Sequence, residues 1–570
     1  MITALRRKAR QVVHDPILRR WLAAVLLGRY RRPRPFAAGR PPYLGAAVIE
    51  DAAASACPFR DLDATPPSRP LTLSLPGETV AVRPEAPAAL FDRDYADTET
   101  LLAVHRFAWT PLAGRAIDAN WVDLLWREWA ARHGEVDDGW AWHPYTAAER
   151  AINILDFAAV HGLPGERAAT LALLARHARA IAERLEYYGD HNTSNHLSNN
   201  GRGLYRLGLE LGIDSAAAMG ARILLAEAGR IFRPSGLLRE GSAHYHLLLT
   251  RNYASAWLAA ERHNRPEKGT LGAVTQRALE AIPHLALPGG MPLVGDISPD
   301  CPPEFLHCLL PDGDPRSGWG GLLTDDDFAA METLRARCRP CSPDRAAADG
   351  WVRFIAGDWA CLWHVAPEGW PRMPGHAHQD LGSFELHHRN IPLFVDPGRG
   401  AYGDDGDAAW FTTAAAHNTL LIDDAGPYPN NKPYYGDDFR RSIAGPPSIT
   451  RARDGVTVTH PGFGRLRGVG EVSRTLSFAD AAVTIADRIE GSGTHRIVRR
   501  LHTPLSVVQD VDAVIVGDAR ERVRIVTDGT VTLEKSKVWT AYGVSRPATV
   551  IDIAAEQTLP TRLSLTIDAA

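Results

Sequence analysis

The sequence predicts a multidomain α+β protein in which a helical region precedes a β-sheet region. Three observations predict it. The chain has 570 residues, too many for one hydrophobic core. Apolar residues recur every three or four positions from about residue 98 to 290, and after about residue 350 they alternate instead. A proline- and cysteine-rich segment near residues 299–345 separates the two patterns, so at least two domains are expected.

The helical region is predicted from spacings such as that of Leu174, Ala178, Ile181 and Leu185, with breaks at 162–164, 189–190 and 212. Successive helices joined by short turns form antiparallel hairpins, and a row of hairpins can curve into a solenoid or toroid. Residues 64–86 precede it; they are rich in proline and contain a strand-like stretch at 71–75. We interpret them as an entry segment.

The β region is predicted from alternating stretches at 456–459, 483–485 and 523–526, with turn signals at 453–455 and 528–529 between them. A stacked antiparallel sandwich is the simplest arrangement of such strands.

Charge is distributed unevenly along the chain, whose net charge is −4. Residues 1–34 hold ten Lys or Arg and one acid, which leaves 53 bases and 66 acids, a net charge of −13, for the remainder. Because the remainder of the chain is this acidic, it is expected to bind nucleic acid poorly. An anionic substrate would need a locally basic cleft.

The basic start of the chain resembles a signal peptide only in part. Its apolar run, 21–27, is of minimal length, is followed by further arginines and has no small-residue cleavage site. We therefore favour an amphipathic surface helix that could touch anionic lipid, and a cytoplasmic over a periplasmic or secreted location in a bacterium.

No apolar run approaches the roughly 18 residues of a membrane span. The six cysteines do not suggest a disulfide framework.

His376-Ala377-His378 is the most informative motif, followed by Asp396-Pro397-Gly398 and His417-Asn418-Thr419. Along a strand, a His-x-His pair places both imidazoles on one face, and Asp396 and His417 could join them from neighbouring strands. Two imidazoles and a carboxylate can bind a metal, which leaves the remaining histidine free for proton chemistry. The alternative is a pair of surface histidines.

Three further segments lie upstream: Trp142-His143-Pro144-Tyr145, Thr193-Ser194-Asn195-His196-Leu197-Ser198-Asn199-Asn200, and Glu240-Gly241-Ser242-Ala243-His244-Tyr245-His246. Together with the His-x-His motif, and in the same order, they resemble the signature of heparinase II/III-like polysaccharide lyases over roughly residues 100–425. The resemblance implies an incomplete α/α toroid followed by an antiparallel β-sandwich, with the active cleft where they meet. We expect a basic N-terminal segment at 1–45, the toroid at 46–340 and the sandwich at 341–570.

The resemblance also implies roles for individual residues. Asn195 and His196 would neutralise a uronate carboxylate, while Tyr245 and His376 would serve as acid and base; Tyr253 is the reserve tyrosine. His378, Asp396 and His417 would bind a divalent metal, usually zinc in these lyases, in a structural role. For substrate binding we expect Asn199, Arg202, Arg239, Trp142, His143 and Tyr145.

Each of these residues also has an ordinary structural interpretation. Ser194 or Asn195 could be a helix N-cap, a lone helical tyrosine is more often a core residue, and the aromatic residues around Trp142 could equally be core. The expected function is cleavage of a uronate-containing polysaccharide, a glycosaminoglycan or alginate, by β-elimination. The alternatives are a glycoside hydrolase, which needs a pair of carboxylates, and a non-catalytic glycan-binding protein of an exopolysaccharide system.

Overall fold

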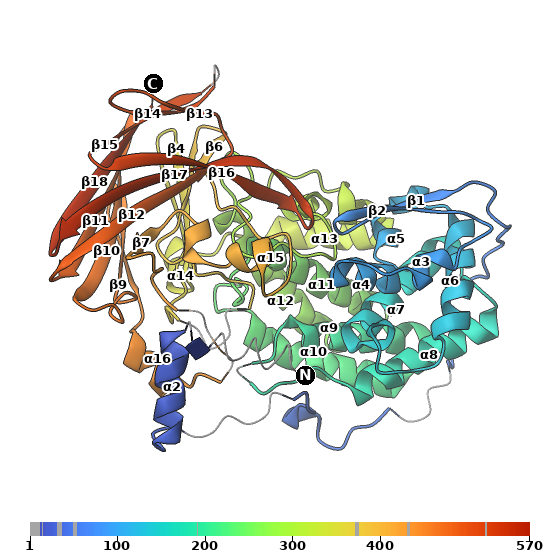
Figure 1. The fold of residues 1–570 in the computed structure, drawn as a ribbon. Coiled ribbons are helices and arrows are strands. Elements are labelled where there is room, and N and C mark those ends of the chain that lie inside the picture. Colours follow the sequence, from blue (N-terminus) through green and yellow to red (C-terminus); the bar gives the residue numbers. More distant parts are fainter. Residues whose placement is uncertain are drawn as a thin grey trace.

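The computed structural model describes residues 12–13, 15–30, 37–49, 54–190, 192–370, 375–429, 432, 434–518 and 521–569. A helical domain and a β domain lie side by side, and the amino-terminal helix lies beneath the β domain (Figure 1). The α-helices are α2 (Pro16–Leu26), α3 (Ala89–Asp92), α4 (Thr98–Arg106), α5 (Trp109–Leu112), α6 (Ala119–His133), α7 (Pro144–His161), α8 (Arg167–Glu183), α9 (Asn195–Leu211), α10 (Asp214–Ile231), α11 (Ala243–Arg262), α12 (Lys268–Ala281), α13 (Asp325–Arg337), α14 (Pro343–Ala348), α15 (Gly406–Trp410) and α16 (Asp437–Ile443).

The strands are β1 (Leu71–Leu75), β2 (Glu78–Val82), β3 (Trp351–Ala356), β4 (Trp359–His364), β5 (Glu385–His388), β6 (Ile391–Phe394), β7 (Leu420–Ile422), β8 (Ser448–Arg451), β9 (Gly455–His460), β10 (Val469–Phe478), β11 (Ala482–Gly491), β12 (Thr494–Thr503), β13 (Val507–Gln509), β14 (Val514–Gly517), β15 (Arg522–Thr527), β16 (Thr530–Ala541), β17 (Val544–Thr558) and β18 (Thr561–Ala569). Short 3-10 helices occupy Pro42–Leu44, Gly114–Ala116, Trp140–Trp142, Ile282–His284, Pro303–Leu309, Gly318–Leu322 and Ala414–Ala416.

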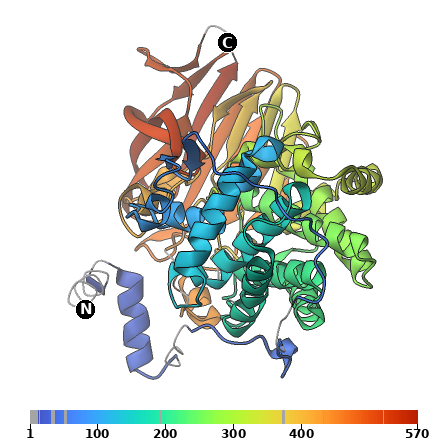
Figure 2. The same cartoon turned by 90° about the vertical axis from the view of Figure 1, so that its right-hand side faces the viewer.

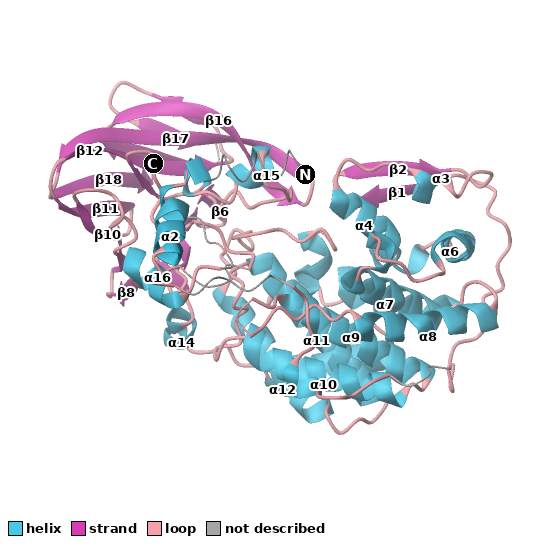
Figure 3. Ribbon diagram, turned by 60° about the horizontal axis from the view of Figure 1, so that its bottom comes forward, coloured by secondary structure: helices cyan, strands magenta, loops and turns pink. Residues whose placement is uncertain are grey.

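The helical domain is built on α7, α9 and α11, which are buried along most of their length. Helix α9 packs against α7, α8, α10 and α11, and Figure 3 shows this group together on one side of the molecule. Close packing is possible because α9 presents glycine where α10 and α7 approach: a Cβ on Gly208 would meet the backbone of Ala217 within 3 Å. The predicted helical region is therefore confirmed, as is the strand at 71–75.

The β domain is a sandwich of antiparallel sheets. One layer is an eight-stranded sheet in the order β13-β14-β15-β18-β11-β10-β9-β8. Facing it are two four-stranded sheets, β3-β4-β5-β6 and β16-β17-β12-β7, which adjoin where the Val395 N–H donates to the His502 carbonyl at 3.0 Å. One hydrophobic core is shared between the layers, with Val352, Trp359 and Leu386 packed among Val456, Ile485 and Ile567. The predicted sandwich is confirmed.

Helix α2 is amphipathic, as predicted, but its apolar face is already covered. Ile17, Leu18 and Trp21 are buried, and the Trp21 ring lies 4.6 Å from that of Tyr434 and 5.8 Å from that of Tyr435. Lipid contact through this face would require the helix to leave the β domain. Residues 1–11, which carry much of the basic charge, lie outside the described residues. Among the helices described, none is long and apolar enough to cross a membrane.

The two domains meet along a seam formed by loops. The segment after the helical domain pairs with the loops of the β domain, because the Asp296 N–H donates to the His376 carbonyl at 3.0 Å and the Ile297 N–H to the Arg399 carbonyl at 2.9 Å. The turn at Gly77, between β1 and β2, also touches the turn at Gly543, between β16 and β17. Figure 2 shows the helical domain packed broadly against the sheets.

Candidate active site

A pocket of about 720 Å³ lies on this seam. Its wall combines the beginnings of helices with loops of the β domain. The lining residues are Thr98, Glu99, Leu102, Arg106, Trp140, His143, Tyr145, Glu186, Tyr188, Asn192, Ser194, Asn195, His196, Tyr245, Pro299, Asp300, Gly375, His376, Tyr402 and Lys432.

Three buried helices begin at this pocket. Tyr145 is the second residue of α7, Asn195 the first of α9 and Tyr245 the third of α11, and all three line the wall. The positive ends of the three helix dipoles are therefore directed towards the same space. Such an arrangement favours a carboxylate in the pocket.

Asn195 is held by one acid, Glu240, and by His376 of the β domain. Ser194 caps α9, so Asn195 is not the cap. The Asn195 side-chain amide donates from Nδ2 to Glu240 Oε2 at 2.8 Å, and the same nitrogen lies 3.1 Å from His376 Nε2. Glu240 also accepts from the Asn195 backbone N–H at 2.9 Å. Both N–H groups of the amide are therefore engaged in this structure.

His376 is oriented by Asp296. Its Nδ1 lies 3.0 Å from Asp296 Oδ2. Burial alone would raise the pKa of Asp296, but hydrogen bonds from His376 and His378 outweigh burial and hold that pKa well below its ordinary value. The carboxylate thus accepts a hydrogen bond from Nδ1–H, and Nε2, which faces the donating amide of Asn195, is an acceptor. This tautomer suits a general base.

Tyr245 stacks on His376, with ring centroids 3.4 Å apart and an interplanar angle of 12°. Its hydroxyl lies 2.7 Å from that of Tyr402, which comes from a loop of the β domain. Burial, followed by the negative charge of Asp300, raises the pKa of Tyr245 well above 10. Burial and this negative charge both disfavour the phenolate, so the phenol is neutral.

His196 supplies positive charge. Its Nδ1 lies 2.7 Å from Glu186 Oε1, and His143 Nε2 lies 3.5 Å from the same oxygen. Burial lowers the pKa of His196, but the adjacent Glu186 carboxylate outweighs burial and raises it above its ordinary value. Glu186 therefore makes the imidazolium form of His196 more favourable than it is in an isolated histidine.

The pocket is not strongly basic, contrary to the expectation for an anionic substrate. Arg106 lines it, but its guanidinium is already paired with Asp300 at 2.8 Å and Glu99 at 3.2 Å. Asp300 also accepts from the Tyr145 hydroxyl at 2.6 Å. Attraction for an anion therefore comes from His196 and the helix beginnings more than from an excess of arginine and lysine.

Several predicted substrate-binding residues do not reach the pocket. Trp142 is fully buried and donates to the His133 carbonyl, while Arg202 is buried with Glu149 at 2.7 Å and with Asn199 at 3.3 Å. Arg239 also lies outside the lining. Trp142, Asn199 and Arg202 are therefore corrected from substrate contacts to residues that support the helical packing, and Arg239 is corrected to a residue outside the pocket. His143 and Tyr145 do line the pocket, as does the half-exposed Trp140.

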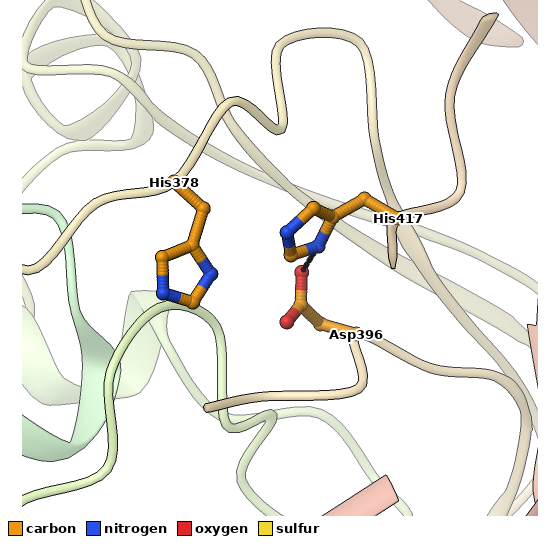
Figure 4. Close-up of side chains that lie close together, drawn as sticks. All are labelled: His378, Asp396 and His417. Atoms are coloured by element: carbon orange, nitrogen blue, oxygen red, sulfur yellow. Dashed lines mark hydrogen bonds and ion pairs between the residues drawn. The ribbon is translucent and has the colours of Figure 1, made fainter. Parts of the chain in front are cut away.

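The proposed metal ligands lie together, although not on strands. His378 belongs to a loop before β5, Asp396 follows β6 and His417 precedes β7, so the predicted His-x-His strand is wrong. Potential ligand atoms of the three residues lie within 4.8 Å of one another. Figure 4 shows the His378 ring facing the hydrogen-bonded pair of Asp396 and His417, whose Oδ2 and Nδ1 are 2.9 Å apart.

The chemistry of this cluster fits a divalent cation. Nδ1 of His378 is buried and has no hydrogen-bond partner among the described residues, whereas Nε2 lies 2.9 Å from Asp296 Oδ1. A buried imidazole nitrogen without a partner is costly unless it binds a ligand, and two imidazoles with a carboxylate are a zinc-type set. Asp296 then orients His378 from outside this set.

Sequence reasoning missed five residues that organise the site: Glu186, Glu240, Asp296, Asp300 and Tyr402. Glu240 lies inside one of the motifs named above, and Asp296 lies in none of them. Each carboxylate belongs to a contact between distant segments; for example, 80 residues separate Asp296 from His376. Sequence spacing carries no signal for such a contact.

Comparisons with known proteins agree with this architecture. Residues 340–566 match the sequence model of the family described as heparinase II/III-like, C-terminal. A structure of heparinase III is similar over 97% of this chain and 92% of that chain, with 14% identity and a TM-score of 0.60. The heparan sulfate lyase of Pedobacter heparinus is similar over 83% and 77%, with 17% identity and a TM-score of 0.52. A search of curated proteins found no match.

The fold expected from the sequence motifs, an incomplete helical toroid followed by a β-sandwich, is therefore confirmed. Residues 340–566 thus resemble the carboxy-terminal region of heparinase II/III-like proteins, and the chain as a whole has the fold of heparinase III.

Proposed function

We propose that this protein is a polysaccharide lyase that cleaves a uronate-containing polysaccharide by β-elimination. The observation that carries the proposal is the meeting of Asn195, His196, Tyr245 and His376 in one pocket at the beginnings of buried helices. A glycan-binding protein does not need an oriented base beside a neutral phenol. A hydrolase needs two carboxylates that flank the scissile bond, whereas Glu240 and Asp296 are each engaged with Asn195 or the histidines.

The first step is neutralisation of the uronate carboxylate, which makes the proton on the adjacent carbon more acidic. The cationic His196 and the three helix beginnings supply positive potential. Asn195 can bind the carboxylate only if one of its two present hydrogen bonds is exchanged. Exchange of the bond to His376 also frees Nε2 of that histidine.

The second step is elimination. His376 Nε2 takes the proton from the carbon beside the carboxylate, the electron pair of that bond becomes the new carbon–carbon double bond, and the bond to the glycosidic oxygen breaks. Tyr245 is neutral and can protonate the departing oxygen. Tyr402, 2.7 Å from the Tyr245 hydroxyl, can then help to restore the proton.

A divalent cation, zinc by ligand type, would be held by His378, Asp396 and His417. There it would stabilise the loops that carry His376, and it takes no part in the elimination steps.

The product identifies the reaction. Elimination leaves a double bond conjugated to the uronate carboxylate, so cleavage of an accepted polymer should produce ultraviolet absorbance together with new reducing ends. Heparan sulfate, hyaluronan, chondroitin and alginate should be assayed in parallel. New reducing ends without the absorbance would show hydrolysis and overturn the proposal.

Tyr245→Phe should lower kcat by about 10²–10⁴-fold, because it removes the acid while the aromatic ring remains. The matched control is Tyr253→Phe, eight residues later on α11, where the hydroxyl is fully buried and donates to the Leu224 carbonyl at 3.0 Å. The control should keep near-normal kcat. Near-normal turnover in Tyr245→Phe would remove this tyrosine from the mechanism.

Substrate affinity should fall as pH rises. The pKa of His196 is raised, so its positive charge is present below that pKa and is lost as the pH increases through it. KM should therefore rise on the alkaline side, and Glu186→Gln should shift this rise to lower pH because the stabilising carboxylate is gone. Glu183→Gln changes an acid whose side chain is 60% exposed and is the control. Coincident KM profiles for Glu186→Gln and the unmodified protein would rule out this role.

Substitution of the two histidines of the His-x-His motif should have different effects on metal binding and on activity. His378→Ala should lose the metal and lower the Tm, because a metal bound only by the folded protein adds its binding free energy to stability. His376→Ala should keep the metal and lose activity. Metal content and melting curves of both variants test this; equal metal loss would make His376 a ligand, and full retention in His378→Ala would exclude the cluster.

A further inference from the structure

A second cavity, of about 340 Å³, lies at the opposite end of the three buried helices. The pocket described above is lined by their first residues, whereas this cavity is lined by their later turns, including Asp156 of α7, Arg206 of α9 and Arg251 of α11. It therefore belongs to the same helices but not to the same site. The proposed elimination uses none of its residues.

Apart from His161, whose ring stacks on that of Phe157, the ionisable groups that line the cavity have hydrogen-bonded or ionic partners, with one exception. Arg206 bonds to Asp156 at 2.8 Å, and Arg262 bonds to Asp327 at 2.9 Å. Glu210 lies within 3.7 Å of both arginines. Arg115, at the rim, donates to two backbone carbonyls. The three acids of the lining are thus each matched to an arginine.

Arg251 is the exception. It is only 7% exposed and it lines the cavity, yet no residue in the described parts of the chain forms a hydrogen bond or ion pair with its guanidinium. Its Nε is fully buried without a partner. An isolated buried guanidinium is costly, whereas an anion that enters the cavity would pair with it.

The rest of the wall indicates what kind of anion fits. Phe157, Leu258 and Trp319 supply apolar and aromatic surface, which suits the face of a ring. The Ser255 hydroxyl, which accepts from Arg206 at 3.3 Å, still has a proton to donate to a ligand hydroxyl. With one unpaired positive charge, the cavity suits a single negative charge.

We infer that this cavity is a second binding site, distinct from the active pocket, for a sugar acid: one carboxylate on a hydroxylated ring. The carboxylate pairs with Arg251, and the ring lies against the aromatic and apolar wall. The inference depends on the cavity alone and would hold for any activity of the other pocket.

Titration calorimetry with sodium glucuronate tests the site. The background is Asn195→Ala, which removes a carboxylate-binding group from the active pocket. One molecule of glucuronate should bind, and Arg251→Met in this background should weaken binding at least about tenfold, because a buried charge-assisted hydrogen bond is lost. Arg251→Met removes an unpaired charge, so the fold should persist.

A second variant blocks the cavity without touching Arg251. Val160 lines the mouth and is 41% exposed, so Val160→Trp can narrow the entrance while the core stays intact. It should weaken glucuronate binding by a similar factor. Glucose and inorganic phosphate, which offer the ring or the charge alone, should bind at least about tenfold more weakly than glucuronate. Undiminished binding in either variant, equal binding of glucose or phosphate, or no binding of glucuronate would overturn the inference.

Discussion

The carboxylate of Asp296 is the interaction on which the rest of the site depends. It comes from the segment that leaves the helical domain, and it contacts His376, His378 and Arg399 of the β domain. The backbone around it is equally constrained: Gly295 has a φ of +82°, and a Cβ there would lie 2.7 Å from the His376 carbonyl. One side chain therefore joins the domains, fixes the tautomer of the proposed base and orients a proposed metal ligand.

The direction of the buried helices is the second constraint. Because α7, α9 and α11 begin at the same pocket, the positive ends of their dipoles meet there without a surplus of basic side chains. The same packing buries polar residues about two turns further along α9, where Arg202 is neutralised by Glu149. A polar residue close to a motif can thus serve the helix bundle and never meet a ligand.

This explains which parts of the site could be predicted. The helical and β regions follow from periodicity, and Asn195, His196, Tyr245 and His376 stand in motifs whose residue types suggest their chemistry; the structure brings all four to one pocket. Asn199 and Arg202 share the motif or the helix with Asn195 but face inwards. The His-x-His segment was predicted as a strand, yet it is a loop held by Asp296, since contacts across the domain seam override the local pattern.

Local charge also decides the protonation states that the sequence left open. The motifs assign Tyr245 and His376 to acid and base chemistry without saying which is the acid, and burial together with Asp300 keeps the phenol of Tyr245 neutral. The same acid pairs with Arg106, which removes that cation from the field at the tyrosine. Since Asp296 leaves Nε2 of His376 as an acceptor, the stacked pair consists of one proton donor and one proton acceptor in contact. An elimination that needs an acid and a base together can use this pair without prior ionisation of the tyrosine.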